Sequence, residues 1–194
     1  MRRPPRHRGR GRVLARELIA WINGLAKVHT HEFQSVAFGG LKHINGEEHQ
    51  YRWVEDTILV RDSASVLVRG SDGSIQQVGT NLEFESDASV AVPDANVQRA
   101  LRLFGAGESD WRELYKVLEV VEADLGGLQG IEAAGLAPRS RLRVFKQTAN
   151  SRAALGDAAW HGTESGLPPK DPMTLGEANA LVRDLLRSWL ALKR

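Results

Sequence analysis

The residue types best suited to chemistry lie between residues 139 and 162. A predicted helix there has one basic flank and ends at Asn150, and a segment broken by Gly156 then leads to His161. Basic side chains hold phosphate groups, so this flank is the best RNA-facing or phosphate-facing surface of the folded part. The alternative is that it pairs with an acidic helix predicted over 111–125 by charge complementarity. The basic residues are Arg139, Arg141, Arg143 and Lys146.

Four helices are predicted within residues 94–193, and they must position this stretch. Each has an amino-terminal signal followed by apolar residues at helical spacing. The helix over 111–125 has the most continuous apolar stripe, and the last helix carries its stripe to Leu190. The signals are Asp94, the Asp110 and Glu113 capping box, Pro138, and the Thr174 and Glu177 capping box.

The pattern changes to that of strands over residues 32–92. Asn45-Gly46 and Asp72-Gly73 are typical of tight hairpin turns, residues 81–85 alternate apolar and polar side chains, and 88–92 add a last strand. Turn signals this close together favour an antiparallel meander or a small sandwich, because parallel strands need long crossover connections. The sequence therefore predicts an α+β fold in three parts: a basic tail and amphipathic helix (1–31), a β-rich unit (32–92) and an α-helical unit (94–193).

The net charge of +2 comes from the amino-terminal tail. Residues 1–12 hold six of the 26 basic residues and no acidic residue, which leaves 20 basic against 24 acidic residues in the rest of the chain. An arginine-rich arm can contact the phosphates of nucleic acid. The preferred interpretation is a disordered, proline- and glycine-containing terminus or an over-extended translation start. Residues 13–27 then show an apolar stripe at helical spacing, which predicts a packing helix or a poorly ordered leader. A basic amphipathic stretch at this place also resembles an organelle transit peptide or a membrane-surface helix.

Several classes of chemistry have no support in the sequence. The chain has no cysteine, which excludes disulfides and thiolate metal sites. Histidines near the start of the β-rich unit invite a metal hypothesis, but no metal-site signature accompanies them and no metal is expected. The phosphate-binding and dinucleotide-binding glycine motifs are absent, and no cofactor is predicted. With no apolar run of membrane-spanning length, we expect a cytoplasmic protein with no membrane partner. The histidines are His29, His31, His43 and His49.

The carboxyl-terminal half resembles a family of uncharacterised bacterial proteins with a β-rich amino-terminal part. The resemblance covers roughly residues 80–192 and is carried by the segments Arg143-Val144-Phe145-Lys146-Gln147-Thr148-Ala149-Asn150, His161-Gly162 and Pro172-Met173-Thr174-Leu175. It implies an arginine before the histidine, where this chain has Trp160. No activity comes with the resemblance.

A more distant likeness is to HEPN-type helical domains, in which an arginine and a histidine meet at a helix end and cleave RNA. The likeness implies that His161 moves a proton at the 2′-hydroxyl while Arg152 steadies the phosphate, with Asn150 beside them. The spacing between Arg152 and His161 is longer than in such domains, and Gly156 intervenes.

Two functions follow from these observations. The preferred one is a non-catalytic interaction module of a bacterial cytoplasm that binds an unidentified protein partner, with Asn150 and His161 tying the helical unit together. The alternative is an atypical HEPN-like ribonuclease or RNA-binding protein of a defence or toxin system. In that case RNA would bind through the basic helix or the arginine tail.

Overall fold

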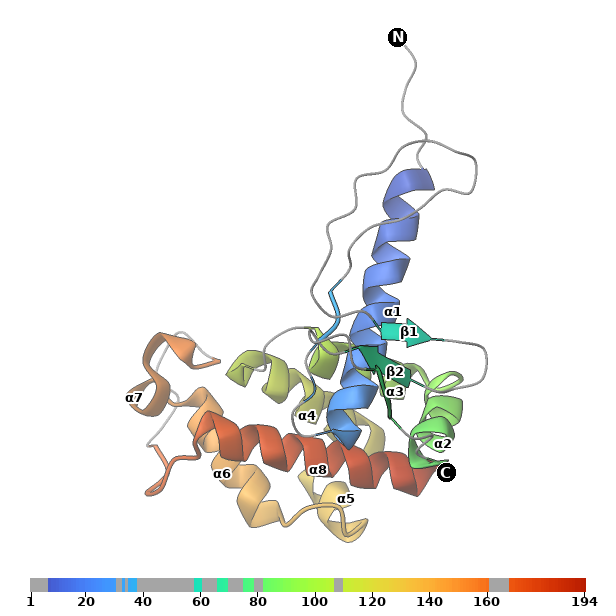
Figure 1. Cartoon of the computed structure of the whole chain (residues 1–194). Coiled ribbons are helices and arrows are strands. Elements are labelled where there is room, and N and C mark those ends of the chain that lie inside the picture. Colours follow the sequence, from blue (N-terminus) through green and yellow to red (C-terminus); the bar gives the residue numbers. More distant parts are fainter. Residues whose placement is uncertain are drawn as a thin grey trace, which may run out of the picture.

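The computed structural model describes residues 7–30, 33, 35–37, 58–60, 66–69, 75–78, 82–106, 110–160 and 168–194. Helices dominate this part of the chain (Figure 1). They are α1 (His7–His29), α2 (Leu82–Ala91), α3 (Ala95–Gly105), α4 (Trp111–Leu125), α5 (Leu128–Ala133), α6 (Arg139–Asn150), α7 (Arg152–Leu155), the 3-10 helix η1 (Gly156–Ala158) and α8 (Leu175–Lys193).

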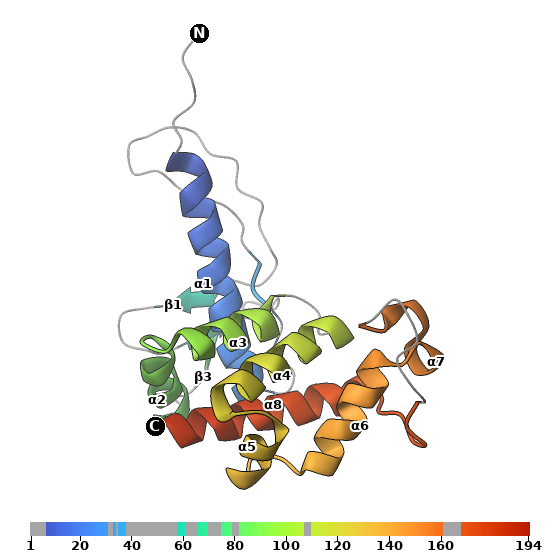
Figure 2. The same ribbon diagram turned by 180° about the vertical axis from the view of Figure 1, so that it is seen from behind.

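A single buried cluster joins the larger helices. α8 contacts α1, α2 and α4, and from behind α3 is seen crossing in front of α1 (Figure 2). Trp189 of α8, Phe145 of α6 and Leu25 of α1 are fully buried in this cluster. Burying one such side chain contributes about 1.5–3 kcal/mol. The helices are therefore held by one shared core rather than by pairwise contacts alone.

The closest helix crossing lies between α1 and α3. A Cβ atom built on Gly24 would lie 1.9 Å from the carbonyl oxygen of Leu101, and one built on Gly105 would lie 1.9 Å from that of Ala20. The two backbones therefore touch without side chains between them. Gly24, which the sequence suggests would only weaken a helix end, is required at this crossing.

Side-chain caps fix where the helices begin. Asp94 accepts hydrogen bonds from the backbone N–H groups of Asn96 and Val97, and Asp110 accepts one from Glu113. Thr174 and Glu177 form a reciprocal capping box at α8. These three predicted starts are confirmed, and α4 has the predicted bounds of 111–125. Pro138 stands immediately before α6 as its N-cap residue.

Three short strands form a small antiparallel sheet in the order β1 (Ile58–Val60), β2 (Val66–Arg69) and β3 (Ile75–Val78). Leu59 is paired with Leu67, and Leu67 is paired in turn with Gln77. Nearer the helices, the segment 35–37 is bound to α1. The side-chain amide of Asn23 donates to the carbonyl oxygen of Val36 and accepts from its N–H, both at 2.9 Å.

The predicted α+β class is wrong, because the part of the chain that the structure describes is mainly helical and its buried core comes from helices and the loops beside them. The strands predicted over 81–85 and 88–92 are also wrong, since this segment forms α2. Phe84, Asp87, Ala88 and Ala91 recur at helical spacing, and all four are buried or partly buried. The predicted turns at Asn45-Gly46 and Asp72-Gly73 lie outside the described residues.

Candidate functional site

An aromatic stack lies at the carboxyl end of α6. Tyr115 of α4 stacks on Phe145 with ring centroids 6.2 Å apart, and on Trp160 with centroids 5.4 Å apart. Trp160 reaches Tyr115 because the chain turns back after α6, and its backbone N–H donates to the carbonyl oxygen of Ala149 at 2.7 Å. Two lysines lie over the stack. Lys146 Nζ is 5.4 Å from the Tyr115 ring centroid, and Lys116 Nζ is 5.7 Å from that of Trp160.

The three residues predicted for proton chemistry are only partly described. His161 lies outside the described residues. The side-chain amide of Asn150 donates to the hydroxyl of Tyr115 at 3.3 Å, which joins it to the aromatic stack. Arg152 lies instead in α7, where its guanidinium is 3.7 Å from the carboxylate of Asp157 and its side chain is 58% exposed. Asn150 and Arg152 thus engage different partners.

Among the basic residues of α6, some are paired or partly buried and others are exposed to solvent. Lys146 donates to both carboxylate oxygens of Glu122 on α4, at 3.0 and 2.9 Å. Burial by itself lowers the pKa of Lys146, but the hydrogen bonds and the charge of Glu122 outweigh it, so the pKa is raised. Arg139 is partly buried, whereas Arg141 and Arg143 are exposed. Charge pairing between α6 and α4 therefore occupies Lys146 and leaves two arginines at the surface.

A threonine of the same helix is buried and structural. Thr148 Oγ1 donates to the carbonyl oxygen of Val144 at 2.8 Å and accepts from the backbone N–H of Met173 at 3.1 Å. This contact pins the loop before α8 to α6. The segment around Thr148, which is one of those that carry the family resemblance, is therefore explained in part by packing.

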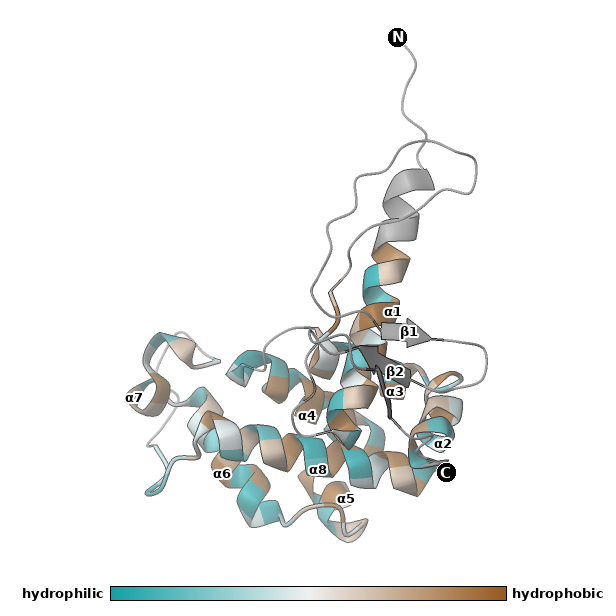
Figure 3. Cartoon of the chain, in the orientation of Figure 1, coloured by the Kyte–Doolittle hydropathy of each residue, from teal (hydrophilic) through white to brown (hydrophobic). Residues whose placement is uncertain are grey.

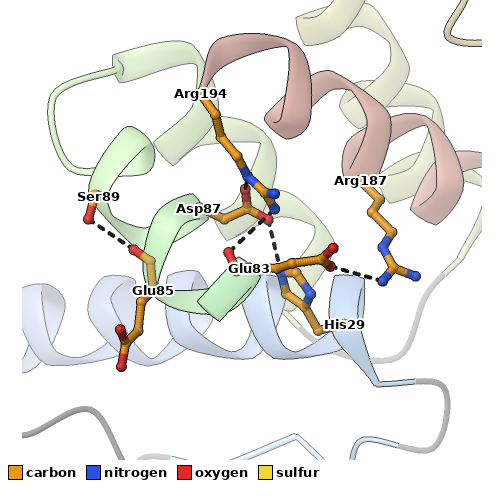
Figure 4. Close-up of polar contacts among 7 residues, drawn as sticks. All are labelled: His29, Glu83, Glu85, Asp87, Ser89, Arg187 and Arg194. Atoms are coloured by element: carbon orange, nitrogen blue, oxygen red, sulfur yellow. Dashed lines mark hydrogen bonds and ion pairs between the residues drawn. The ribbon is translucent and has the colours of Figure 1, made fainter. Parts of the chain in front are cut away.

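A buried charged cluster lies where α1, α2 and the end of the chain meet (Figure 4). His29 Nε2 is 2.9 Å from one carboxylate oxygen of Asp87, and Arg194 Nε donates to the other oxygen at 2.7 Å. The side chains of Asp87 and His29 are 0% and 4% exposed. Burial by itself raises the pKa of Asp87, but hydrogen bonds from His29 and Arg194 outweigh it, so the pKa is lowered.

The His29 and Asp87 pair has the chemistry of a base held by a carboxylate, as in hydrolytic enzymes. Its surroundings do not suit that role. Phe84 packs against the His29 ring with centroids 5.8 Å apart, and both members of the pair are buried away from solvent. The cluster therefore stabilises the packing of α1, α2 and the end of the chain against one another.

A second charged network joins the ends of three helices. Lys193 Nζ lies 2.7 Å from Asp94 and 2.9 Å from Asp124, and Trp189 Nε1 donates to Asp124 at 2.9 Å. A hollow of about 820 Å³ opens beside Lys193 and Arg194. Because both cations already bind carboxylates, this hollow offers no uncompensated charge for an anionic ligand.

An apolar groove lies along the part of α1 that projects from the helical body. The residues that line it are Leu14, Glu17, Leu18, Trp21, Val92, Gln98 and Arg102, and we call it the α1 groove. Its volume is about 250 Å³. Leu14, Leu18 and Val92 are 59, 55 and 64% exposed. Figure 3 shows apolar residues on α1 beyond the point where the helix leaves the body.

Two basic residues of α3 lie at or beside the α1 groove. Arg102 lines it and donates to Gln98 at 3.4 Å, and Arg99 is exposed one turn earlier. Neither forms an ion pair with another residue that the structure describes. Glu17 is the one acidic residue among those described as lining the groove.

The sequence alone predicts neither the buried cluster nor the α1 groove. Asp87 gives no signal because it lies between the two segments, 81–85 and 88–92, that the pattern predicts as strands. The apolar stripe of α1 was found, but a stripe alone predicts burial along its whole length. Only the structure shows that its second half is buried and its first half is not.

Comparisons with protein-family models, with curated proteins and with solved structures find no match to this chain. Among the described residues, no helix is both long enough and apolar enough to cross a membrane. No group of three or more potential metal ligands occurs in that same part of the chain. His31, His43 and His49 lie outside it.

Proposed function

We propose that this protein is a non-catalytic interaction module that binds a partner protein through the α1 groove. One observation carries the proposal: the apolar stripe of α1 continues past its buried half. Leu25 and Val28 are buried in the core, Trp21 is partly buried, and Leu14 and Leu18 on the same face are exposed. A partner that covered the exposed half would complete the stripe.

The energetics support this role. Each leucine side chain transferred from water into an interface contributes about 1.5–3 kcal/mol before the costs of association. Val13 adds a further exposed apolar side chain beside Leu14. Contiguous apolar surface with a polar rim is typical of sites that bind other proteins. Leu14, Leu18 and Trp21 lie within two turns, which is a suitable spacing for helix anchors.

The described polar residues support a non-catalytic role. Asn150 is bonded to Tyr115, Arg152 lies beside Asp157, and His29 is enclosed with Asp87. Each of these contacts holds one part of the protein to another. In this proposal the candidate residues stabilise the body that presents α1.

Photocrosslinking tests the proposal directly. A photoreactive amino acid would replace Leu18 in the full chain, expressed in the organism that encodes it, with Leu192 as the matched control position. Leu192 is also 55% exposed but does not line the groove. We expect discrete adducts from position 18 that are absent from position 192. The same adducts from both positions, or none from position 18, would contradict the proposal.

RNA binding is the second candidate, and the exposed arginines of α6 favour it. Arg141 and Arg143 lie at the surface of the helix that also carries the lysine and the phenylalanine of the aromatic stack. Exposed basic side chains on one helix can contact the phosphates of RNA. Fluorescence anisotropy with a uridine-rich RNA should show binding that weakens with salt and is lost in Arg141→Glu/Arg143→Glu. Cleavage abolished by His161→Ala would extend this candidate to a ribonuclease.

A further inference from the structure

We infer that the α1 groove receives an acidic amphipathic helix of the partner protein. The inference rests on the proposed function, because it names the chemistry of the partner that the exposed stripe of α1 would bind. Shape and charge carry it, and each excludes a different occupant.

The shape of the site favours a helix over a membrane surface. Leu14, Leu18 and Trp21 form one wall, and Val92 with Gln98 and Arg102 forms the other, around a hollow of about 250 Å³. A concave site of this kind accepts side chains that project from a partner helix. A bilayer presents a flat surface and would leave the floor of the hollow uncovered. The partner would therefore supply apolar side chains at helical spacing.

The charges at the groove indicate which polar residues the partner helix should carry. Arg102 lines the groove and Arg99 is exposed one turn before it on α3, and neither has an ion-pair partner among the described residues. The sequence adds six arginines and no acidic residue over 1–12, a segment whose last residues belong to α1. Complementary potentials speed association and reject partners of the wrong sign. Acidic residues beside the apolar anchors would match this surface.

The same charges disfavour a second copy of the chain. Two α1 helices packed through this face would bring both copies of Arg102, and of Arg99 one turn before it on α3, toward one interface. Like charges placed together in an interface oppose association. Glu17 provides one acidic residue per copy at the groove. A distinct, acidic partner satisfies the groove better.

A displayed library of helical peptides tests the inference on the full chain. Each 20-residue peptide would carry leucines at every third and fourth position, with the remaining positions randomised among Glu, Lys, Gln and Ala. Peptides retained by the wild type would be compared with those retained by Leu14→Ser/Leu18→Ser, whose substitutions are at exposed positions. We expect the peptides that depend on Leu14 and Leu18 to be more acidic than the starting library.

The best acidic peptide would then be measured by fluorescence anisotropy against matched variants. Leu14→Ser/Leu18→Ser should weaken binding by at least about 100-fold, and Leu192→Ser should not. Arg99→Glu/Arg102→Glu should weaken it by about tenfold at low salt, with a smaller effect at high salt. Arg141→Glu/Arg143→Glu on α6 makes the same change in net charge and should have little effect.

Each other outcome overturns the inference in an identifiable way. Neutral or basic peptides that still depend on Leu14 and Leu18 would leave the interaction module standing and remove the acidic partner. A dimer in sedimentation that Leu14→Ser/Leu18→Ser abolishes would assign the groove to a second copy. If RNA or phosphatidylserine vesicles bound through the same leucines, the groove would be a nucleic-acid-binding or a membrane-binding site instead. No retention that depends on Leu14 and Leu18, with no adducts from position 18, would end both proposals.

Discussion

Asp87 of α2 binds both His29 of α1 and Arg194 at the end of the chain, and so joins three parts of the protein. It is fully buried, yet both of its oxygens have cationic or potentially cationic partners, Arg194 and His29. An ionised carboxylate is costly to bury without such partners. Removing it would leave His29 and Arg194 facing a small cavity, so its loss should cost more than the loss of an exposed ion pair.

We therefore expect Asp87→Ala to lower the free energy of unfolding by about 3 kcal/mol, because breaking a buried pair leaves its partners uncompensated. Glu83→Ala is the matched control on the same helix, since Glu83 and Arg187 form an ion pair that is about half exposed. Urea unfolding followed by circular dichroism measures both. Equal losses in the two variants would show that Asp87 contributes no more than a surface charge.

Acid should destabilise the protein through three carboxylates. Hydrogen bonds and nearby cations lower the pKa values of Asp87, Asp94 and Asp124 in spite of their burial. Because these pKa values are lower in the folded state, the ionised groups stabilise the fold above the unfolded value of about 3.9. That stabilisation is lost as the pH falls through the folded pKa values.

The urea midpoint should accordingly fall between pH 6 and pH 3. The fall should be smaller in Asp124→Asn, which has already lost one of the carboxylates that Lys193 binds. A midpoint that is flat over this range, or one that rises on acidification, would contradict the assignment of these groups as stabilising carboxylates.

At the scale of elements, the crossing of α1 and α3 tolerates no added side chain. Gly24→Ala and Gly105→Ala should each lower the free energy of unfolding by about 1–3 kcal/mol or more, because the added Cβ would meet backbone atoms. Gly176→Ala in the first turn of α8 is the control, since a Cβ there meets nothing within 4 Å. That variant should be neutral or slightly more stable. A neutral Gly24→Ala would show that the helices can separate without loss.

The helices that the sequence predicts are those whose starts carry local signals. Asp94, Asp110 and Thr174 cap their own helices, so the decisive contacts lie within a few residues. The sequence does not reveal α2 because Phe84 is the one large apolar residue among the inward-facing residues Phe84, Asp87, Ala88 and Ala91. Asp87 binds His29 and Arg194, which are 58 and 107 residues away. No local pattern reveals a contact of that separation.

The candidate site was predictable only in part for the same reason. The basic flank of α6 was found from its arginines, but the pairing of Lys146 with Glu122 depends on how α4 and α6 pack. The likeness to an RNA-cleaving motif points to Asn150, whose side-chain amide donates a hydrogen bond to the hydroxyl of Tyr115. The α1 groove requires Val92 to lie beside α1, and no local pattern in the sequence indicates that contact.

At the scale of the whole molecule, α1 belongs to the core through one half only. Leu25, Val28 and Asn23 are buried, so deletion of residues 1–30 should abolish cooperative unfolding or yield insoluble protein. Deletion of residues 1–12 removes the part of α1 that precedes these contacts and should leave the thermal midpoint nearly unchanged. Differential scanning calorimetry of the two truncations distinguishes them. A stable, cooperative 31–194 fragment would show that α1 is an appendage.

One helix with a buried half and an exposed half should also exchange its amide hydrogens at two rates. Amides near Leu25 can exchange only when the core opens, whereas those near Leu14 and Leu18 exchange through local fraying. Mass spectrometry after deuteration would record a gradient of protection along α1. A ligand in the groove would flatten that gradient from its exposed end, and so reveal its own docking position without a structure of the complex.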